Sequence, residues 1–196
     1  MKTTRSYTMG ARARSVEETR RRILDATAAL SEQRRISAIS LEDVAGESGV
    51  SVQTVLRQFG SRSGLFDAVS EHVRKAVTEE RAVPAGDVDR AVHVVVDHYE
   101  ARGRAVLLLL AQESEDPQVR SVTTGGKQIH RAWVEQVFAP FSPGEELVDL
   151  LVVATDLYAW KLLRLDRGLS RGQTEERMKT LVRAVLATTE RKAGQP

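Results

Sequence analysis

Apolar side chains recur every three or four residues along most of the chain, which is the spacing of one face of an α-helix. The pattern predicts a first helix from Val16 to about Arg34, then three further helices, the last of them marked by apolar residues up to Val73. Pro84-Ala85-Gly86 interrupts the pattern, and Asp87 is placed to cap the next helix. No alternating run with a Gly-rich two-residue turn occurs, so no sheet is expected. The sequence therefore predicts an all-α fold.

Longer helices are predicted beyond this boundary. Their expected ranges are about 87–113, a short segment after Pro117, about 127–138, about 145–167 and about 173–191, with breaks at Pro140 and Pro143-Gly144. Residues 1–15 are polar, basic and aperiodic, and we interpret them as a flexible arm. The chain then divides into a three-helix domain at 16–66, a connecting helix and boundary at 67–86, a larger helical domain at 87–191 and a tail at 192–196.

Length and composition are those of a folded globular chain. The 196 residues are 41% hydrophobic and carry a net charge of only +2, which is enough to form one large domain or a small domain joined to a larger one. The absence of cysteine excludes a disulfide framework, thiolate catalysis and any Cys-built metal site. The N-terminus lacks the apolar segment of a signal peptide. The longest apolar run, Ala105–Ala111, is far shorter than the roughly 20 residues of a membrane span. We therefore expect a cytoplasmic protein with no membrane partner.

The charges are unevenly distributed along the chain. Residues 1–64 hold 11 Lys/Arg against 7 Asp/Glu, whereas residues 65–196 hold 18 against 20. Within the first 22 residues, seven basic side chains face only Glu17 and Glu18. A basic N-terminal part on a mildly acidic body suggests a polyanionic partner for that part. The alternative is a solvated tail that only aids solubility.

Two short helices joined by a tight turn are expected between Ser40 and Phe59. Ser40 has Asp43 at the capping-box position, and Ser51 caps the second helix. Gly49 ends the first helix, where a positive φ is often needed and glycine adopts it without steric cost. Ala45 allows a close approach of the two helices, with valines filling the space between them. Together these features predict a helix-turn-helix.

The second of these helices is polar on its outer face and at its N-terminal end. The residues left facing outward are Ser51, Val52, Gln53, Thr54, Arg57 and Gln58. A helix of this kind suits the major groove of DNA. The alternative is an ordinary helical hairpin, in which the same alanine, glycine and valines would also be expected.

Residues about 17–66 resemble the DNA-binding region of the TetR (tetracycline-repressor-like) transcription regulators. The resemblance rests on residues 39–45, Gly49-Val50-Ser51, Thr54-Val55, Phe59 and 61–66. Leu56 departs from the family, which usually has a tyrosine there that contacts a backbone phosphate. Val52 and Gln53 also replace more usual residues. These departures bear on the operator sequence rather than on DNA binding itself. The helices around residues 154–163 resemble the C-terminal half of some members more weakly.

Roles can be assigned to the outward residues from their chemistry and from the resemblance. Gln53 and Arg57 are expected to read base edges, because Gln pairs with adenine and Arg with guanine. Ser51 and Thr54 have short hydroxyls suited to phosphates or, in the case of Thr54, to a base. Ser40 and Arg62 match family positions that hold phosphates, which position the protein without reading sequence. The N-terminal arm is a candidate for the minor groove, with a solvated tail as the alternative.

The last two expected helices carry more apolar surface than one core can cover. A helix that is apolar on both sides must be buried on both, and a second subunit can cover the second side. The resemblance implies the same arrangement, a four-helix bundle between two copies of the chain on a pseudo-palindromic operator. The candidate interface residues are Leu150, Val153, Leu157, Met178, Leu181, Val182 and Val185.

A small-molecule effector is implied by the resemblance, and residues between the C-terminal helices are candidates for its pocket. They are Tyr99, Leu109, Trp133, Phe138, Asp156 and Trp160. Tyrosine and tryptophan carry a polar group that needs a partner, and Asp156 can answer a ligand cation. The alternatives are simple core for the apolar residues and a solvated or interface carboxylate for Asp156.

Few residues in the sequence support a role in catalysis or metal binding. Asp89, His93 and Asp97 share one helix face, where a solvated role is more usual than a metal site. Gly125-Gly126-Lys127 lacks the spacing of a phosphate-binding loop, and residues 60–64 do not form a nucleophile elbow. We therefore expect no catalytic residue, metal or cofactor. The leading hypothesis is a homodimeric repressor released from DNA by a small molecule, and the alternative is a helical ligand carrier or enzyme with an incidental N-terminal hairpin.

Overall fold

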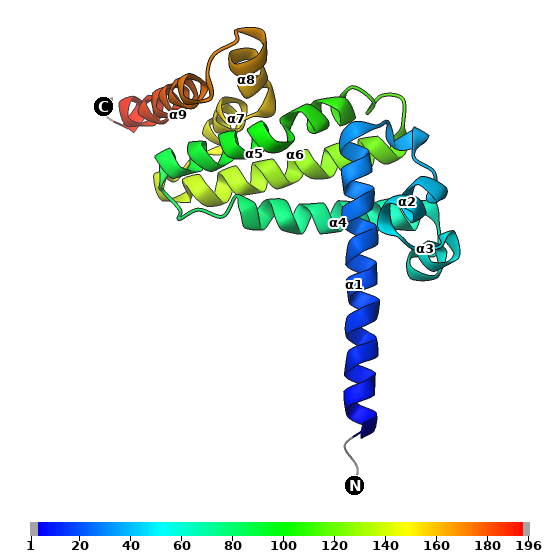
Figure 1. The fold of residues 1–196 in the computed structure, drawn as a ribbon. Coiled ribbons are helices and arrows are strands. Elements are labelled where there is room, and N and C mark those ends of the chain that lie inside the picture. The colour runs from blue at the N-terminus through cyan, green and yellow to red at the C-terminus, as the bar shows by residue number, and fades with distance from the viewer. Residues whose placement is uncertain (1–3, 194–196) are drawn as a thin grey trace.

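The computed structural model describes the backbone of residues 4–193 and the side chains of residues 13–188. This part of the chain is mostly helical and contains no strand, which confirms the all-α prediction (Figure 1). The first elements are α1 (Thr4–Gln33), the short 3-10 helix η1 (Ile36–Ala38), α2 (Leu41–Ser48), α3 (Val52–Phe59) and α4 (Arg62–Glu80). They are followed by α5 (Val88–Leu110), α6 (Pro117–Phe138), η2 (Ala139–Phe141), α7 (Glu145–Ala154), α8 (Leu157–Lys161), the π-helical η3 (Leu162–Asp166) and α9 (Arg171–Ala193). None of the described helices combines the length and apolar character that a membrane span needs.

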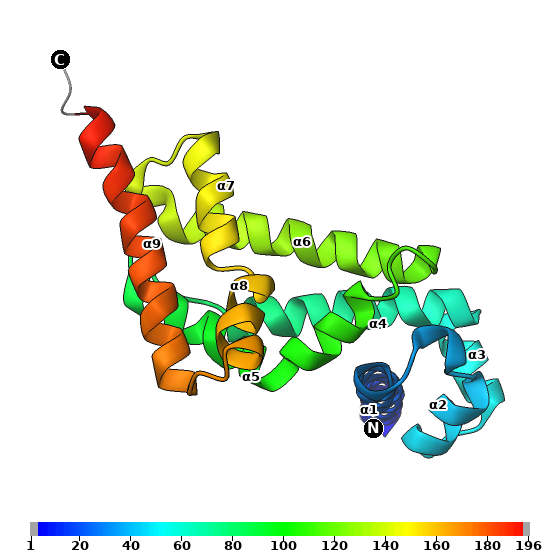
Figure 2. The same cartoon turned by 90° about the horizontal axis from the view of Figure 1, so that it is seen from above.

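Two apolar cores organise the molecule. The head core lies among α1, α2, α3 and the first half of α4, and the body core lies among α5, α6, α7, α8 and α9. We call these two regions the head and the body; α4 leads from the first to the second (Figure 2). The head core is completed by the body, because the fully buried Val119 of α6 belongs to it and Leu109 of α5 packs against it. The two regions therefore share an apolar contact as well as a helix.

Local signals explain the boundaries of the head helices. The Ser40 side chain accepts from the Asp43 amide, and the Asp43 side chain accepts from the Ser40 amide, so the capping box is complete. Gly49 ends α2 with φ +67°, a left-handed conformation that glycine adopts without steric cost. Ser51 caps α3 through the Thr54 amide. These three positions confirm the boundaries expected from the sequence.

The expected flexible arm is wrong for residues 4–15, since α1 is continuous from Thr4 (Figure 1). An aperiodic pattern does not by itself predict coil, because Ala, Arg and Met favour helix. The later part of α1, which packs in the head core, supplies a nucleus from which the helix extends back to Thr4. Residues 1–3 lie outside the described residues.

Two further boundaries differ from expectation in the body. The short segment and helix expected after Pro117 form one helix, α6, which passes through Gly125-Gly126 without a break. The glycine cost of about 1 kcal/mol each is outweighed by a buried face that includes Val119, Trp133 and Phe138. The single helix expected at 145–167 is divided after Ala154, because Asp156 caps a new helix by accepting from the Tyr158 amide. Apolar periodicity continues through this bend and therefore gave no sign of it.

Candidate nucleic-acid interface

The α2–α3 pair is packed tightly enough to hold α3 as a fixed element. Val44 and Val55 are fully buried between the helices and Ala45 is nearly so. The α3 helix is strongly amphipathic, with Val55 facing inward and Gln53 and Arg57 exposed to solvent. Thr54 and Gln58 are half-buried beside them, and Val52 packs partly against the head core. The arrangement presents Gln and Arg side chains on the outer face of a short, rigid helix, as expected from the sequence.

The long helix α1 contacts the C-terminal end of α3. The Arg20 guanidinium lies 4.5 Å from the centre of the Phe59 ring and donates to the Gln58 carbonyl at 3.3 Å. In the sequence, Arg20 is only one of several basic residues near the N-terminus. The structure instead uses it to fix α3 against α1, through a cation–π contact and a hydrogen bond.

The two serines expected near phosphates are engaged locally. The Ser51 hydroxyl caps α3 and lies 3.0 Å from the Thr54 hydroxyl. The Ser40 hydroxyl donates to Asp43 Oδ2 at 2.9 Å. Hydrogen bonds from the Ser40 amide, Arg34 and the Ser40 hydroxyl lower the pKa of Asp43 to about 2. Asp43 is therefore an ionised carboxylate beside Ser40, which opposes a phosphate at that hydroxyl. Ser51 and Thr54 face no such charge in their hydrogen bonds, and their phosphate contacts stay predictions.

Arg62 has a structural task that the sequence did not indicate. Its Nε donates to the Ile39 carbonyl at 3.1 Å, its Nη2 donates to the Ile36 carbonyl, and its guanidinium lies 4.7 Å from the centre of the Phe66 ring. The side chain thus ties the first turn of α4 to the segment that enters α2. A role in orienting the helix pair from behind fits these contacts better than direct phosphate binding.

Comparison with known proteins agrees with this geometry. Residues 23–69 match the family model described as bacterial regulatory proteins, tetR family. Residues 23–69, which run from α1 into α4, are therefore similar to the TetR family. Members of this family are DNA-binding transcription factors.

Individual relatives show the same likeness. The chain is 32% identical over 108 residues to the HTH-type transcriptional regulator AlkX of Mycobacterium tuberculosis, an alignment that covers 53% of this chain and 46% of that protein. The match therefore spans just under half the length of this relative. A TetR-family regulator from Mesorhizobium loti is similar in fold at a TM-score of 0.66 and 16% identity, covering 88% of this chain and 97% of that one. A regulator from Saccharomonospora viridis in complex with choline is similar at a TM-score of 0.60 and 16% identity, with 85% and 96% covered.

The residues expected to line an effector pocket are mostly packed core. Tyr99, Trp133 and Trp160 are buried, and each polar group has a partner: the Thr155 carbonyl, the Arg81 carbonyl and Glu100, respectively. Phe138 is fully buried in the body core. Leu109 packs against the head core and so lies apart from the other five. Asp156 caps α8 by accepting from the Tyr158 amide, and its role toward a ligand cation stays a prediction.

The residues expected at a subunit interface separate into two groups. Leu150, Val153 and Leu181 are exposed, at 43%, 65% and 42% of their surface. Leu157, Met178 and Val182 are instead buried in the body core, and Val185 packs partly against it. Leu157, Met178 and Val182 are not available to a partner, because the bend after Ala154 and the packing of α9 on α5 and α7 turn them inward. The place of Val185 in an interface stays a prediction. Tyr158 and Leu162, which were not among the candidates, are also exposed, at 52% and 58%.

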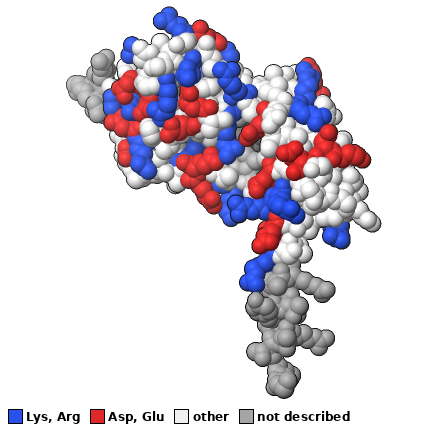
Figure 3. Space-filling view, viewed as in Figure 1, with Lys and Arg blue, Asp and Glu red and all other residues white. Residues whose placement is uncertain are grey.

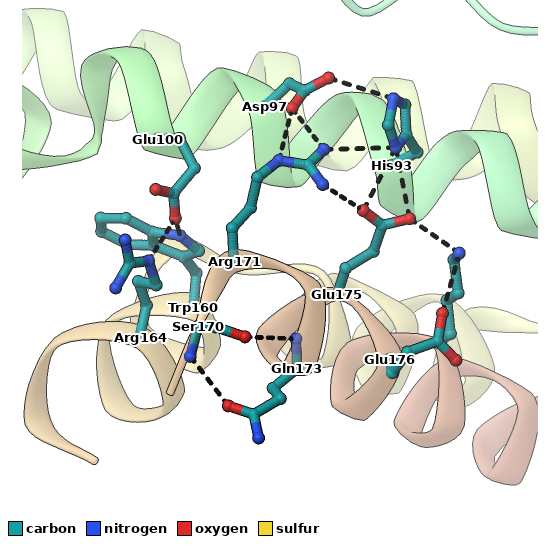
Figure 4. A network of polar contacts seen from close by, with 11 residues as sticks. His93, Asp97, Glu100, Trp160, Arg164, Ser170, Arg171, Gln173, Glu175 and Glu176 are labelled. Atoms are coloured by element: carbon teal, nitrogen blue, oxygen red, sulfur yellow. Dashed lines mark hydrogen bonds and ion pairs between the residues drawn. The ribbon is translucent and has the colours of Figure 1, made fainter. Parts of the chain in front are cut away.

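The acidic face of α5 forms ion pairs with α9 (Figure 4). Asp97 pairs with Arg171, Asp89 with Arg183, and His93 lies 3.2 Å from Glu175. Among the residues that the structure describes, no group of three His, Asp or Glu side chains is arranged to hold a metal. Figure 3 shows basic and acidic side chains interspersed over the body in this view. The body therefore shows no extended field of one sign on this face.

Proposed function

We propose that the protein is a sequence-specific, DNA-binding transcription regulator that places α3 in the major groove. The observation that carries the proposal is the exposure of Gln53 and Arg57 on a helix held by Val55 inside and by Arg20 at its end. Gln and Arg are the side chains that read adenine and guanine edges bidentately. The exposed Leu56 adds an apolar contact on the same helix, suited to a thymine methyl group.

The regulator acts as a homodimer in this proposal. Leu150 and Val153 on α7 and Leu181 on α9 are exposed, and α7 and α9 pack against each other in the body. A second copy related by two-fold symmetry covers the same patch on both subunits. The two reading helices then face half-sites of a pseudo-palindromic operator.

Repression relieved by a small molecule completes the proposal. An effector shifts the DNA-binding equilibrium only if it binds one conformation better than the other. The link between head and body, made by α4, Val119 and Leu109, supplies a route by which a change in the body reaches α3. The choline bound by the regulator from Saccharomonospora viridis supports the idea that this fold holds small molecules.

Selection of bound sites from random duplex DNA, followed by gel-shift titration over a range of salt, tests DNA binding. We expect enrichment of a pseudo-palindrome and an affinity that falls steeply with salt. Arg57→Ala should relax preference at one base position by about 1–3 kcal/mol. The exposed Arg90→Ala on α5 is the matched control. Failure to enrich any sequence, together with weak and salt-insensitive binding, contradicts the proposal.

The dimer is tested separately with two exposed valines. Val153→Glu places a charge in the proposed interface and should give monomers in sedimentation or light scattering. Val16→Glu on α1, where the valine is 52% exposed, is the matched control and should leave the dimer intact. Equal mass for both variants and the unmodified chain, at concentrations where that chain is dimeric, would show that α7 is not in the interface.

A further inference from the structure

A buried arginine lies where the end of α4 meets the body. Arg81 closes α4 and is only 4% exposed. Its guanidinium lies 4.2 Å from the centre of the Trp133 ring, and Nη2 lies 2.9 Å from His130 Nδ1. Trp133 in turn donates from Nε1 to the Arg81 carbonyl at 2.8 Å. The residue is therefore held by α6 on two sides.

The Arg81 charge has no carboxylate partner among the residues that the structure describes, and its Nε has no hydrogen-bond acceptor there. The neighbouring Glu80 is occupied by Arg102 at 2.8 Å. Burial lowers the pKa of Arg81, but a guanidinium pKa is so high that the group stays charged. Buried charges in proteins are almost always paired, because an unpaired ion in an apolar interior is costly. A buried donor and an uncompensated positive charge thus coincide at one side chain.

The two nearby histidines do not supply the missing charge. Burial, with the Arg81 charge next, lowers the pKa of His130 to about 3, so the ring is neutral and accepts from Arg81 at Nδ1. Its Nε2 then donates toward the Val152 carbonyl, 3.3 Å away. Burial lowers the pKa of His98 to about 4, and His98 Nδ1 lies 3.5 Å from Glu80 Oε2 without the alignment of a hydrogen bond. The cluster of Arg81, His98 and His130 therefore carries one net positive charge.

We propose that Arg81, His98 and His130 form the recognition point for a small-molecule carboxylate, which is the effector of this regulator. The inference rests on the proposed function and specifies the chemistry of its effector. The carboxylate accepts from Arg81 Nε and Nη2 in the two-point geometry that guanidinium and carboxylate share. The Arg81 guanidinium gives up its contact with His130 to make this pair.

The surroundings favour a ligand that is apolar apart from its acid group. The polar atoms of Tyr99 and Trp133 are already bonded to backbone carbonyls. Their rings pack in the apolar body core beside the cluster, with Trp160 6.0 Å from Tyr99 between ring centroids. Because Arg81 ends the same helix that begins at Arg62 behind the α2–α3 pair, a ligand that moves Arg81 acts on α4 and hence on the head.

A matched ligand panel tests the proposal on the full-length chain. Straight-chain alkanoates of graded length are compared with the alcohol and the amine of each length, at constant ionic strength. We expect the acids to raise the melting temperature and to weaken binding to the selected operator by about tenfold. The alcohols and amines should change DNA affinity less than twofold. Equal effects of acid and alcohol, or no effect of any acid on either measurement, overturn the proposal.

Variants on one helix locate the effect. Arg81→Gln should abolish the response to acids, whereas the exposed Arg74→Gln, also on α4, should keep it. Arg81→Lys retains the charge but loses the two-point geometry, and should respond more weakly than the unmodified chain. If Arg81→Gln does not fold, the Arg81→Lys comparison and the ligand panel decide. An Arg81→Lys or Arg81→Gln protein that responds to acids as strongly as the unmodified chain contradicts the assignment.

The two proposals fail in different ways. If the chain binds no operator under any condition, the proposed function is wrong, and the melting-temperature panel still decides whether carboxylates bind at Arg81. If the operator is bound but is released only by neutral or cationic compounds, the regulator stands and the carboxylate assignment is wrong.

Discussion

The head and the body reach their structures by different physical means. In the head, α2 and α3 have eight residues each and are bounded by side chains that cap them locally, such as Ser40 and Ser51. In the body, the boundaries depend on what distant helices cover, as where α6 continues through Gly125-Gly126. Because its helices are capped locally, the head can expose polar side chains although its core is small. A helix that contacts DNA bases needs such exposed polar side chains. The body buries polar and charged groups, including Arg81 and Thr155, that only its tertiary structure satisfies.

The largest difference should appear in the body core. Phe138→Ala removes a fully buried ring at the end of α6 and should lower the free energy of unfolding by about 3–5 kcal/mol. Phe141→Ala, three residues later, removes a ring that is 39% exposed and should cost far less. Urea unfolding followed by tryptophan fluorescence measures both. Equal losses would show that the body does not owe its stability to this core.

The contrast between the regions also explains what could be predicted from the sequence. The caps of α2 and α3 and the left-handed Gly49 were predictable because each depends on residues within four positions. The division after Ala154 was not, because the apolar pattern continues while the chain turns at Asp156. The burial of Met178 likewise depends on helices that are distant in the sequence. For the candidate site, the exposure of Gln53 and Arg57 followed from the amphipathic pattern.

The two arginines that hold the site in place did not follow from the sequence. Arg20 looks like any surface arginine in the sequence, and only the tertiary structure places it over Phe59. Arg62 faces Phe66 one turn later in the same helix, but its bonds to the Ile36 and Ile39 carbonyls depend on tertiary structure. The sequence gives no sign that Arg81 is buried either, because Arg81 follows Glu79 and Glu80 in a polar stretch. The sequence shows where proline and aromatic residues lie, but it does not show which of them a long polar side chain contacts, because tertiary packing decides that partner.

Acid should destabilise the body through its buried histidines. The pKa values of His98 and His130 are lowered to about 4 and about 3, against 6.5 in the unfolded chain. Below pH 6.5 the unfolded chain therefore binds protons that the folded chain does not, and stability falls as the pH falls toward 4. At pH 5.5 the two groups together should cost about 3 kcal/mol.

Unfolding measured between pH 7.5 and 5 checks this slope. His98→Asn and His130→Asn should each flatten the dependence relative to their own stability at pH 7.5. His72→Asn, a replacement of a more exposed histidine on α4, controls for the loss of an imidazole. An unchanged slope in both buried variants would show that other groups cause the acid sensitivity.

Glycine substitutions should have opposite signs at two places in the body. A Cβ added to Gly103 would lie 2.7 Å from Trp160 Cζ3, and Trp160 is held by its hydrogen bond to Glu100. Gly103→Ala should therefore destabilise the chain by about 1–3 kcal/mol through overpacking. A Cβ on Gly125 meets nothing within 4 Å, so Gly125→Ala should stabilise α6 by up to about 1 kcal/mol. Thermal unfolding of the two variants decides between these outcomes, and the same sign for both would contradict this account of α5 and α6.

The smallest effect is expected in the head, where one cap contributes little to the whole molecule. Ser40→Ala removes the acceptor for the Asp43 amide and should lower the free energy of unfolding by about 1 kcal/mol. Ser63→Ala, an exposed serine in the first turn of α4, is the control and should be close to neutral. Hydrogen exchange adds the sharper measurement, because loss of the cap should speed exchange in α2 and α3 while the α5 and α6 amides stay protected. Exchange that rises equally in head and body would mean that the two regions unfold as one unit, and that local capping does not set the stability of the reading helix.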